Sequence, residues 1–119
     1  MVRKGAEKPA WAVVLTNDGW YGISAGPYQH LAAAQMRAVE EGISIVRSAN
    51  SGISAVINPY GEIKAEIGLG ERGAVDTLVK PEEAHQTYFG IYGNKIPLAM
   101  SGVFMLLGLL FALGGRRKK

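Results

Sequence analysis

The sequence predicts an α/β domain followed by one transmembrane helix, and three observations carry this prediction. Short apolar runs and one helix-prone stretch alternate over residues 11–79 in the order strand, helix, strand, hairpin, strand. This is the order of an α/β or α+β fold with a largely apolar sheet. Residues 96–113 then carry no charged side chain. A length of 119 residues allows one domain at most.

Composition excludes several classes of protein. An apolar fraction of 48% excludes a globally disordered chain, and 16 glycines indicate many tight turns rather than a simple helical bundle. The chain has no cysteine, so it holds no disulfide scaffold, no cysteine-ligated zinc and no thiol nucleophile. The net charge of +3 comes from a basic run at residues 116–119. It therefore does not indicate a nucleic-acid partner, which would need a basic face.

Apolar runs and turn residues define the first two elements. Residues 11–16 form a continuous apolar run that predicts a buried strand, and the turn signal at residues 17–19 ends it. Pro27 suits the first turn of a helix, and Gly42 suits the position just after its end. The apolar stripe expected on this helix consists of Leu31, Ala34, Ala38 and Val39.

Further strands follow the helix. Residues 43–48 and 53–57 predict two of them. A turn over residues 58–61, with proline at its second position, leads into the alternating pattern of residues 63–67, so a hairpin is expected. Residues 73–79 predict one more strand.

The C-terminal segment predicts a membrane span with a defined orientation. As a helix, residues 96–113 would extend about 27 Å, close to the roughly 30 Å of a bilayer core. A buried core helix is the alternative, and the lack of any polar face disfavours it. Basic residues Arg116, Arg117, Lys118 and Lys119 follow directly, and positive charge stays in the cytoplasm. The expected organisation is a domain over 1–80, a linker over 81–95, a transmembrane helix over 96–114 and a basic cytoplasmic tail over 115–119.

This orientation places residues 1–95 on the far side of the membrane. The stretch shows neither the pattern of a signal peptide nor an earlier hydrophobic span. Topology alone therefore leads us to expect the C-terminal piece of a longer polytopic protein, whose earlier helices carry this segment across.

Two patterns in the sequence suggest a serine-hydrolase site and a metal site, and neither suggestion is favoured. Residues 22–26 match G-x-S-x-G, with Ser24 followed by Asp76 and His85 in the order of a serine hydrolase. The motif is separated from the preceding strand, however, and that fold needs several more strands than this chain supplies. A glycine-rich loop leading into the helix is favoured. Neither His30 nor His85 has a second ligand at metal-binding spacing, so neither a metal site nor a cofactor is expected.

Polar and aromatic residues gather where the first strand ends. Asn17, Asp18, Trp20 and Tyr21 lie in one loop, and the carboxyl ends of strands are where α/β sheets place their sites. Turn chemistry with core aromatics is the competing explanation. Because residues 50–52 repeat the polar pattern after the second strand, we expect one rim of a pocket here.

The same loop carries a family resemblance. Residues 15–22 (LTNDGWYG) and 24–30 (SAGPYQH) closely resemble the apolipoprotein N-acyltransferase family of the nitrilase superfamily. Residues 36–40, 46–57 and 59–61, together with a last membrane helix and a basic tail, extend the resemblance over nearly the whole chain.

The resemblance implies a bacterial inner-membrane enzyme that is multi-pass in its full-length form. Its periplasmic domain is a nitrilase-like α-β-β-α sandwich, of which this chain would supply the C-terminal part. The enzyme moves an acyl chain from a phospholipid to the α-amino group of the lipidated N-terminal cysteine of apolipoproteins. A cysteine thioester carries the acyl group, with a glutamate base and a lysine that stabilises the oxyanion.

All three catalytic residues of the family precede the stretch that opens here, so we expect no catalytic residue in this chain. Lys4, Glu7 and Lys8 have no motif that would place them in those roles. The resemblance implies instead that Asn17, Asp18, Trp20 and Tyr21 form the substrate-binding part, with the tyrosine on a lipid-facing lip.

Taken alone, the chain is expected to be inactive and to fold poorly, because half a sandwich exposes sheet edges and an apolar face. The alternative is a non-catalytic membrane-anchored subunit or remnant that works with a separate chain carrying the catalytic cysteine.

Overall fold

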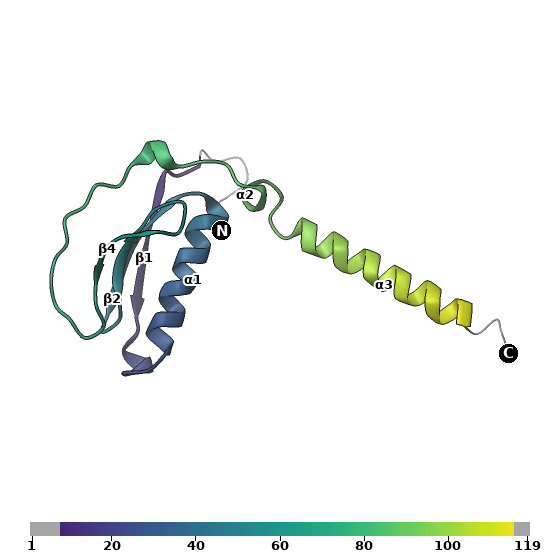
Figure 1. The fold of residues 1–119 in the computed structure, drawn as a ribbon, viewed down its shortest axis with the longest axis horizontal. Helices are drawn as coiled ribbons and strands as arrows, with labels where there is room; N and C mark the ends of the chain where they lie inside the picture. The colour runs from purple at the N-terminus through teal and green to yellow at the C-terminus, as the bar shows by residue number, and fades with distance from the viewer. Residues whose placement is uncertain (1–7, 116–119) are drawn as a thin grey trace. The chain divides into compact units, whose positions relative to one another are not determined.

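The computed structural model describes residues 8–115. The chain divides into two compact units, with the boundary between Thr87 and Tyr88. In the first unit, a sheet is covered on one face by a helix (Figure 1). Its elements are β1 (Trp11–Asn17), the 3₁₀ turn η1 (Gly19–Tyr21), α1 (Gly26–Glu41), β2 (Ser44–Asn50), β3 (Ser54–Ile57), β4 (Ile63–Ile67) and the 3₁₀ turn η2 (Pro81–Glu83).

The four-stranded sheet has the order β1-β2-β3-β4. β1 and β2 are parallel, in register from Trp11 opposite Ser44 to Asn17 opposite Asn50, and α1 makes the crossover between them. β2, β3 and β4 follow as antiparallel neighbours. A parallel pair joined by a helix, extended by an antiparallel hairpin, confirms the predicted α/β class.

α1 has the ends that the sequence predicts. Pro27 lies in its first turn, where the missing N–H costs no hydrogen bond. Gly42 follows its last residue with a φ of +62°, in the left-handed region, and its N–H donates to the carbonyl of Ala38. A glycine takes up this conformation without the steric cost that a Cβ would bring.

The core lies between α1 and one face of the sheet. Its buried members are Leu31, Ala34, Ala38, Ile45, Ile53, Ala55 and Ile57. The prediction that Val39 belongs to the helix stripe is wrong, because this side chain is 48% exposed. Buried positions recur at 27, 31, 34 and 38, and position 39 is rotated about 100° away from the last of them.

β1 is buried less than its composition predicts. Its residues alternate between exposed and half-buried, and Leu15 on the open side is 77% exposed. A continuous apolar run predicts cover on both faces, whereas α1 covers a single face. The strand is present as predicted, and its burial on both faces is not.

The prediction of a strand over residues 73–79 is wrong. This stretch pairs with no strand among the described residues, and its chain follows a wide arc from β4 to η2 (Figure 1). A short apolar pattern can indicate a strand but cannot supply the neighbour with which a strand must pair.

The second unit holds α2 (Tyr88–Tyr92) and α3 (Lys95–Gly115). α3 is long and apolar enough to cross a membrane, and none of the residues in its most apolar stretch is buried. This agrees with the predicted C-terminal transmembrane helix. The basic residues 116–119, like Lys4 and Glu7, lie outside the described residues.

Candidate functional site: the carboxyl ends of β1 and β2

The polar ends of β1 and β2 lie side by side. Asn17 is the register partner of Asn50, so the parallel pairing brings together the two polar strand ends that the sequence singles out. The side-chain Oδ1 of Asn17 accepts a hydrogen bond of 3.0 Å from the N–H of Gly19. A Cβ added to Gly19 would lie 3.1 Å from that oxygen and 3.9 Å from Ser51 Oγ. Both loops therefore converge on Gly19.

Asp18 is the most buried member of this edge, with no exposed surface. Its Oδ1 accepts hydrogen bonds from His30 Nδ1 at 2.8 Å and from Thr16 Oγ1 at 3.2 Å. Its Oδ2 forms an ion pair with Nη2 of Arg47, which is also buried. The Nε of Arg47 donates to the carbonyl of Ile53 at 3.1 Å. One carboxylate thus connects β1, the first turns of α1, and β2.

These partners set the charge of Asp18. Burial acts to raise the pKa of the carboxyl group, but the hydrogen bond from His30 and the positive charge of Arg47 outweigh burial, and the pKa lies below its ordinary value of 3.8. The group is therefore ionised at neutral pH. Asp18 is buried beneath the loop and holds it in place through these contacts. The exposed side chains of the loop are the ones that a ligand could reach.

The turn between β2 and β3 packs closely against Asp18. A Cβ added to Gly52 would lie 2.7 Å from Asp18 Cβ, which is closer than side-chain atoms approach one another. Ser51 beside it has a φ of +59°, an uncommon conformation for a residue other than glycine. The turn is thereby held against Asp18.

The two aromatic residues of the loop differ in their packing. The ring of Tyr21 lies so close to Gly26 that a Cβ added there would be 2.7 Å from Tyr21 Cγ. Its edge meets the ring of His30 at a centroid distance of 5.9 Å, and Tyr21 remains 48% exposed. Trp20 packs against little and is 90% exposed. Of the four predicted residues, Asn17, Trp20 and Tyr21 therefore lie on the surface of this edge.

His30 and Arg47 also belong to this edge through their contacts with Asp18, and the sequence analysis above does not predict either contact. Arg47 does have a signal in the sequence: it follows Ile45 and Val46 in a predicted strand, where a buried arginine needs an acidic partner, and Asp18 comes directly after the neighbouring strand. His30 is half-buried on α1 and faces back to the loop through its bond to Asp18.

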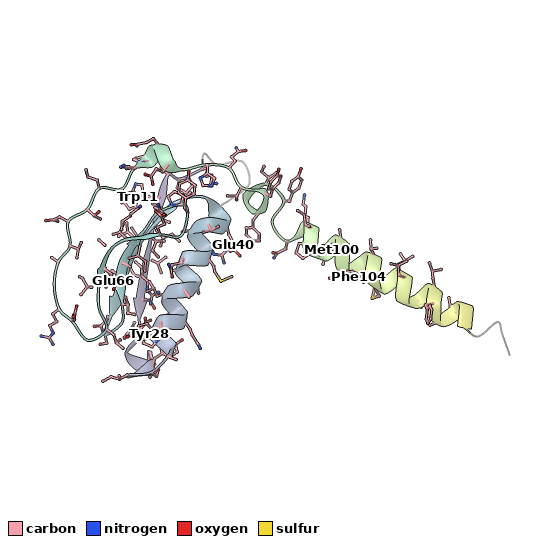
Figure 2. The ribbon with its side chains drawn as sticks, in the orientation of Figure 1. Trp11, Tyr28, Glu40, Glu66, Met100 and Phe104 are labelled. Atoms are coloured by element: carbon pink, nitrogen blue, oxygen red, sulfur yellow. The ribbon has the colours of Figure 1, made fainter. Side chains whose placement is uncertain are left out.

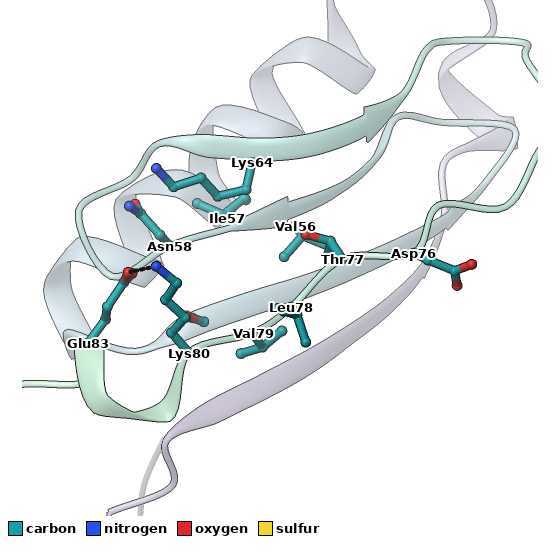
Figure 3. Close-up of a pocket in the computed structure, with 11 residues that line it drawn as sticks. Val56, Ile57, Asn58, Lys64, Asp76, Thr77, Leu78, Val79, Lys80 and Glu83 are labelled. Atoms are coloured by element: carbon teal, nitrogen blue, oxygen red, sulfur yellow. Dashed lines mark ion pairs between the residues drawn. The ribbon is translucent and has the colours of Figure 1, made fainter.

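Two cavities formed by the described residues lie away from this edge. One of about 660 Å³ lies on the open side of the sheet, between β3–β4 and residues 76–80 (Figure 3). Apolar Val56 and Leu78 line it together with Lys64, and Lys80 pairs with Glu83 at its end at 3.7 Å. Another, of about 480 Å³, lies outside α1 beside Tyr60. Neither is lined by any of the four predicted residues.

The serine-hydrolase arrangement is not assembled. Ser24 lies before α1, where its Oγ accepts the N–H of Gly26 at 3.1 Å. His85 lies beyond the other end of α1, where its N–H donates to the carbonyl of Gly42 at 3.0 Å. The helix between them is about 24 Å long. Within residues 8–115, no cluster of three or more acidic or histidine side chains could hold a metal ion.

Comparison with known proteins identifies the family. The carbon-nitrogen hydrolase family matches residues 1–89. Relatives named apolipoprotein N-acyltransferase share 47% identity over 89% of this chain (Rhodopseudomonas palustris), 49% over 95% (Bradyrhizobium diazoefficiens) and 55% over 83% (Rhizobium etli). The chain spans 20% of the length of each of these relatives. Because the family match covers residues 1–89, about three quarters of the sequence, the chain belongs to the carbon-nitrogen hydrolase family.

Proposed function

We propose that this chain is the C-terminal part of an apolipoprotein N-acyltransferase. The complete enzyme would transfer an acyl chain from a phospholipid to the lipidated N-terminal cysteine of apolipoproteins. The observation that carries the proposal is identity of 47–55% to enzymes of that name over most of the chain. Since the chain has no cysteine, the thioester would form on a residue outside it, and the chain alone would be inactive.

In this function the β1–β2 edge forms part of the substrate-binding surface. Asn17 presents a polar side chain at the exposed strand end, and Trp20 and Tyr21 supply apolar surface next to it. An acyl donor and a lipidated acceptor both need such a mixture of polar and apolar contacts. Asp18 contributes from below, by holding the loop in place through Arg47 and His30.

The proposed topology places residues 1–95 in the periplasm and the C-terminus in the cytoplasm of the inner membrane. α3 has the length and apolarity for the span, and the basic residues follow it directly. The test uses the full-length chimera described below, with the cysteines of the relative's part replaced, so that this cysteine-free chain carries the single label. A membrane-impermeant maleimide added from the periplasmic side should modify Ser51→Cys in intact cells, and should modify Arg117→Cys only after lysis. The reverse pattern would contradict this topology.

A chimera tests the transfer activity. The matching segment of the Rhodopseudomonas palustris relative is replaced by this chain, and N-acylation of a reporter lipoprotein is followed by mass spectrometry. We expect the chimera to acylate the reporter and the isolated chain to form no acyl adduct. Trp20→Ala in the chimera should lower the rate, while Met36→Ala, at an exposed position on α1, should not. A chimera that is folded, inserted and inactive would refute the proposal.

A second function keeps the same fold but needs two chains. The lack of cysteine, together with a membrane span, also fits a non-catalytic anchored subunit that completes a separate chain carrying the catalytic cysteine. Co-purification of this chain with such a partner, and acyltransfer by the pair, would favour this function. Activity of the single fused polypeptide alone would favour the first.

A further inference from the structure

His30 contacts the loop between β1 and α1 from the side of the helix. It lies in the first turns of α1, at the end of the helix that Tyr28 marks in Figure 2, with Glu40 at the other end. Its Nδ1 bonds to Asp18 Oδ1 at 2.8 Å, and its ring meets that of Tyr21 at a centroid distance of 5.9 Å. We propose that His30 is a positioning residue that holds the Tyr21 side chain in place, and that the charge of its imidazole sets how firmly.

Asp18, His30 and Tyr21 are connected by three mutual contacts. The N–H of Tyr21 donates to the backbone carbonyl of Asp18 at 3.0 Å, which fixes the Tyr21 main chain to the end of β1. The Asp18 carboxylate fixes the His30 ring, and that ring in turn contacts the Tyr21 ring. The Tyr21 side chain also packs on Gly26. All of these contacts are made within the first unit, so none of them depends on what covers the loop.

The buried carboxylate determines which nitrogen of His30 carries a hydrogen. Asp18 has no exposed surface and is ionised at neutral pH, so its oxygen can only accept a hydrogen bond. The Nδ1 of His30 therefore carries the hydrogen, and in the neutral ring Nε2 is the bare nitrogen. When the ring takes up a second proton at Nε2, the bond from Nδ1 to Asp18 stays in place.

Charging His30 strengthens its hold. A hydrogen bond from an imidazolium to a carboxylate is shorter and stronger than one from a neutral ring. Two other groups of the first unit face this contact. Arg47 pairs through Nη2 with the other oxygen of Asp18, and its repulsion of the imidazolium is outweighed by the carboxylate that both of them touch. Tyr21 presents its ring. Since histidine changes charge between about pH 5 and 8, Tyr21 should be held more firmly at the acidic end of that range.

The inference rests on the proposed function, because Tyr21 matters to the reaction only as part of the substrate-binding surface. A side chain that is already held in place loses little freedom when a substrate binds, and the substrate binds more tightly for that reason. The substrate-binding surface would therefore respond to the pH of its compartment, with tighter binding near pH 5 than near pH 8.

Nuclear magnetic resonance on the full chain in phosphatidylcholine nanodiscs tests the contacts without any acyltransfer. The chain has two histidines, so ¹⁵N-histidine labelling gives two rings, and His30→Asn assigns them. We expect neutral His30 to carry its hydrogen on Nδ1. With ¹³C-labelled tyrosine, the Tyr21 ring signal should move as the pH falls from about 8 to about 5, and should stay still in His30→Asn. The same change at the other histidine, His85→Asn, is the matched control and should leave the movement intact, because His85 lies beyond the opposite end of α1.

Kinetics of the chimera test the positioning role. His30→Asn keeps an N–H that can donate to Asp18 but has no ring to contact Tyr21. We expect it to raise KM about 3–10-fold with little change in kcat, as the loss of one aromatic contact predicts, and to remove the pH dependence of KM. In a Tyr21→Leu background, His30→Asn should raise KM hardly further, because residues that act through one contact are not additive.

Three outcomes would overturn the inference. A hydrogen on Nε2 of neutral His30 would mean that Asp18 does not fix the ring. A Tyr21 signal that moves equally in His30→Asn would mean that another group causes the response to pH. Additive effects of the two substitutions on KM would mean that His30 does not act through Tyr21. An inactive chimera, with the expected spectra from the full chain, would refute the proposed function and leave the hold of His30 on Tyr21 intact.

Discussion

The two faces of the sheet are built from the same strands and differ in what covers them. On the face under α1, Ile45 and Ile57 are at most 1% exposed. On the opposite face, Val13 and Leu15 are 51% and 77% exposed, although they are as apolar as their neighbours. For these four residues, therefore, side-chain polarity does not account for the difference in exposure. The difference teaches that α1 completes one face of the sheet, whereas the outer face of β1 is apolar and has no cover among residues 8–115.

Breaking the buried ion pair should show the largest effect on the covered side. Asp18→Asn leaves the charge of Arg47 buried without its partner, and we expect a loss of about 3–5 kcal/mol in the free energy of unfolding. Urea unfolding of the full chain in nanodiscs, followed by tryptophan emission, measures this loss. Glu62→Gln serves as control, because its ion pair with Lys64 is exposed, and it should shift the urea midpoint hardly at all.

Truncations on opposite faces test the comparison directly. Ile45→Ala should destabilise the first unit by about 2–5 kcal/mol, because it leaves a cavity under α1. Leu15→Ala should cost less than about 0.5 kcal/mol, since the side chain already faces solvent. Equal losses would mean that the open face is covered in solution, and the contrast between the two faces would fail.

Substituting glycines compares a tightly packed position beside Asp18 with an open position elsewhere in the first unit. Gly52→Ala forces a Cβ against Asp18, and overpacking of this kind costs about 1–3 kcal/mol. Gly73→Ala is the matched control, because the nearest side-chain atom to its added Cβ is Ile67 Cδ1 at 4.0 Å. A neutral result for Gly52→Ala would show that the β2–β3 turn can move away from Asp18.

The smallest effect is expected from pH. The folded-state pKa of Asp18 is below its ordinary value of 3.8, so ionisation of this group stabilises the folded state. That contribution is present above the ordinary value and is lost as the pH falls through the lowered pKa. The urea midpoint of the native chain should therefore drop below about pH 4. Asp18→Asn should flatten this dependence, and an unchanged slope would contradict the assignment.

Patterns local to the chain predicted most of the fold. The order of β1, α1, β2, β3 and β4 follows from apolar runs bounded by turn residues, and the positions of Pro27 and Gly42 delimit the helix. The predictions that proved wrong depend on which other segment a strand pairs with or packs against. Within the part of the chain that the structure describes, residues 73–79 have the composition of a strand and no neighbour with which to pair, and the apolar outer face of β1 is left exposed.

The position of the candidate site was predicted from the sequence, but the contacts of Asp18 within it were not. Polar residues after two strands located the edge, and the parallel register brings them together. The pattern did not show that Asp18 points inward to Arg47 and His30. Whether a carboxylate at a strand end is exposed or buried depends on residues that lie 12 and 29 positions along the chain. Such pairings come from the tertiary structure rather than from any local repeat.

The parallel pairing of β1 with β2 also sets the order in which this unit can form. The ribosome makes β1 first, yet β1 can find its partner only after all of α1 and β2 have been made. The antiparallel contacts of β2, β3 and β4 close over much shorter stretches, and each doubling of a closed loop costs about 0.6 kcal/mol more in chain entropy. We therefore expect β2–β4 and the C-terminal half of α1 to form the folding nucleus, with β1 docking last. Substitutions in β1 would then speed unfolding and leave the folding rate almost unchanged.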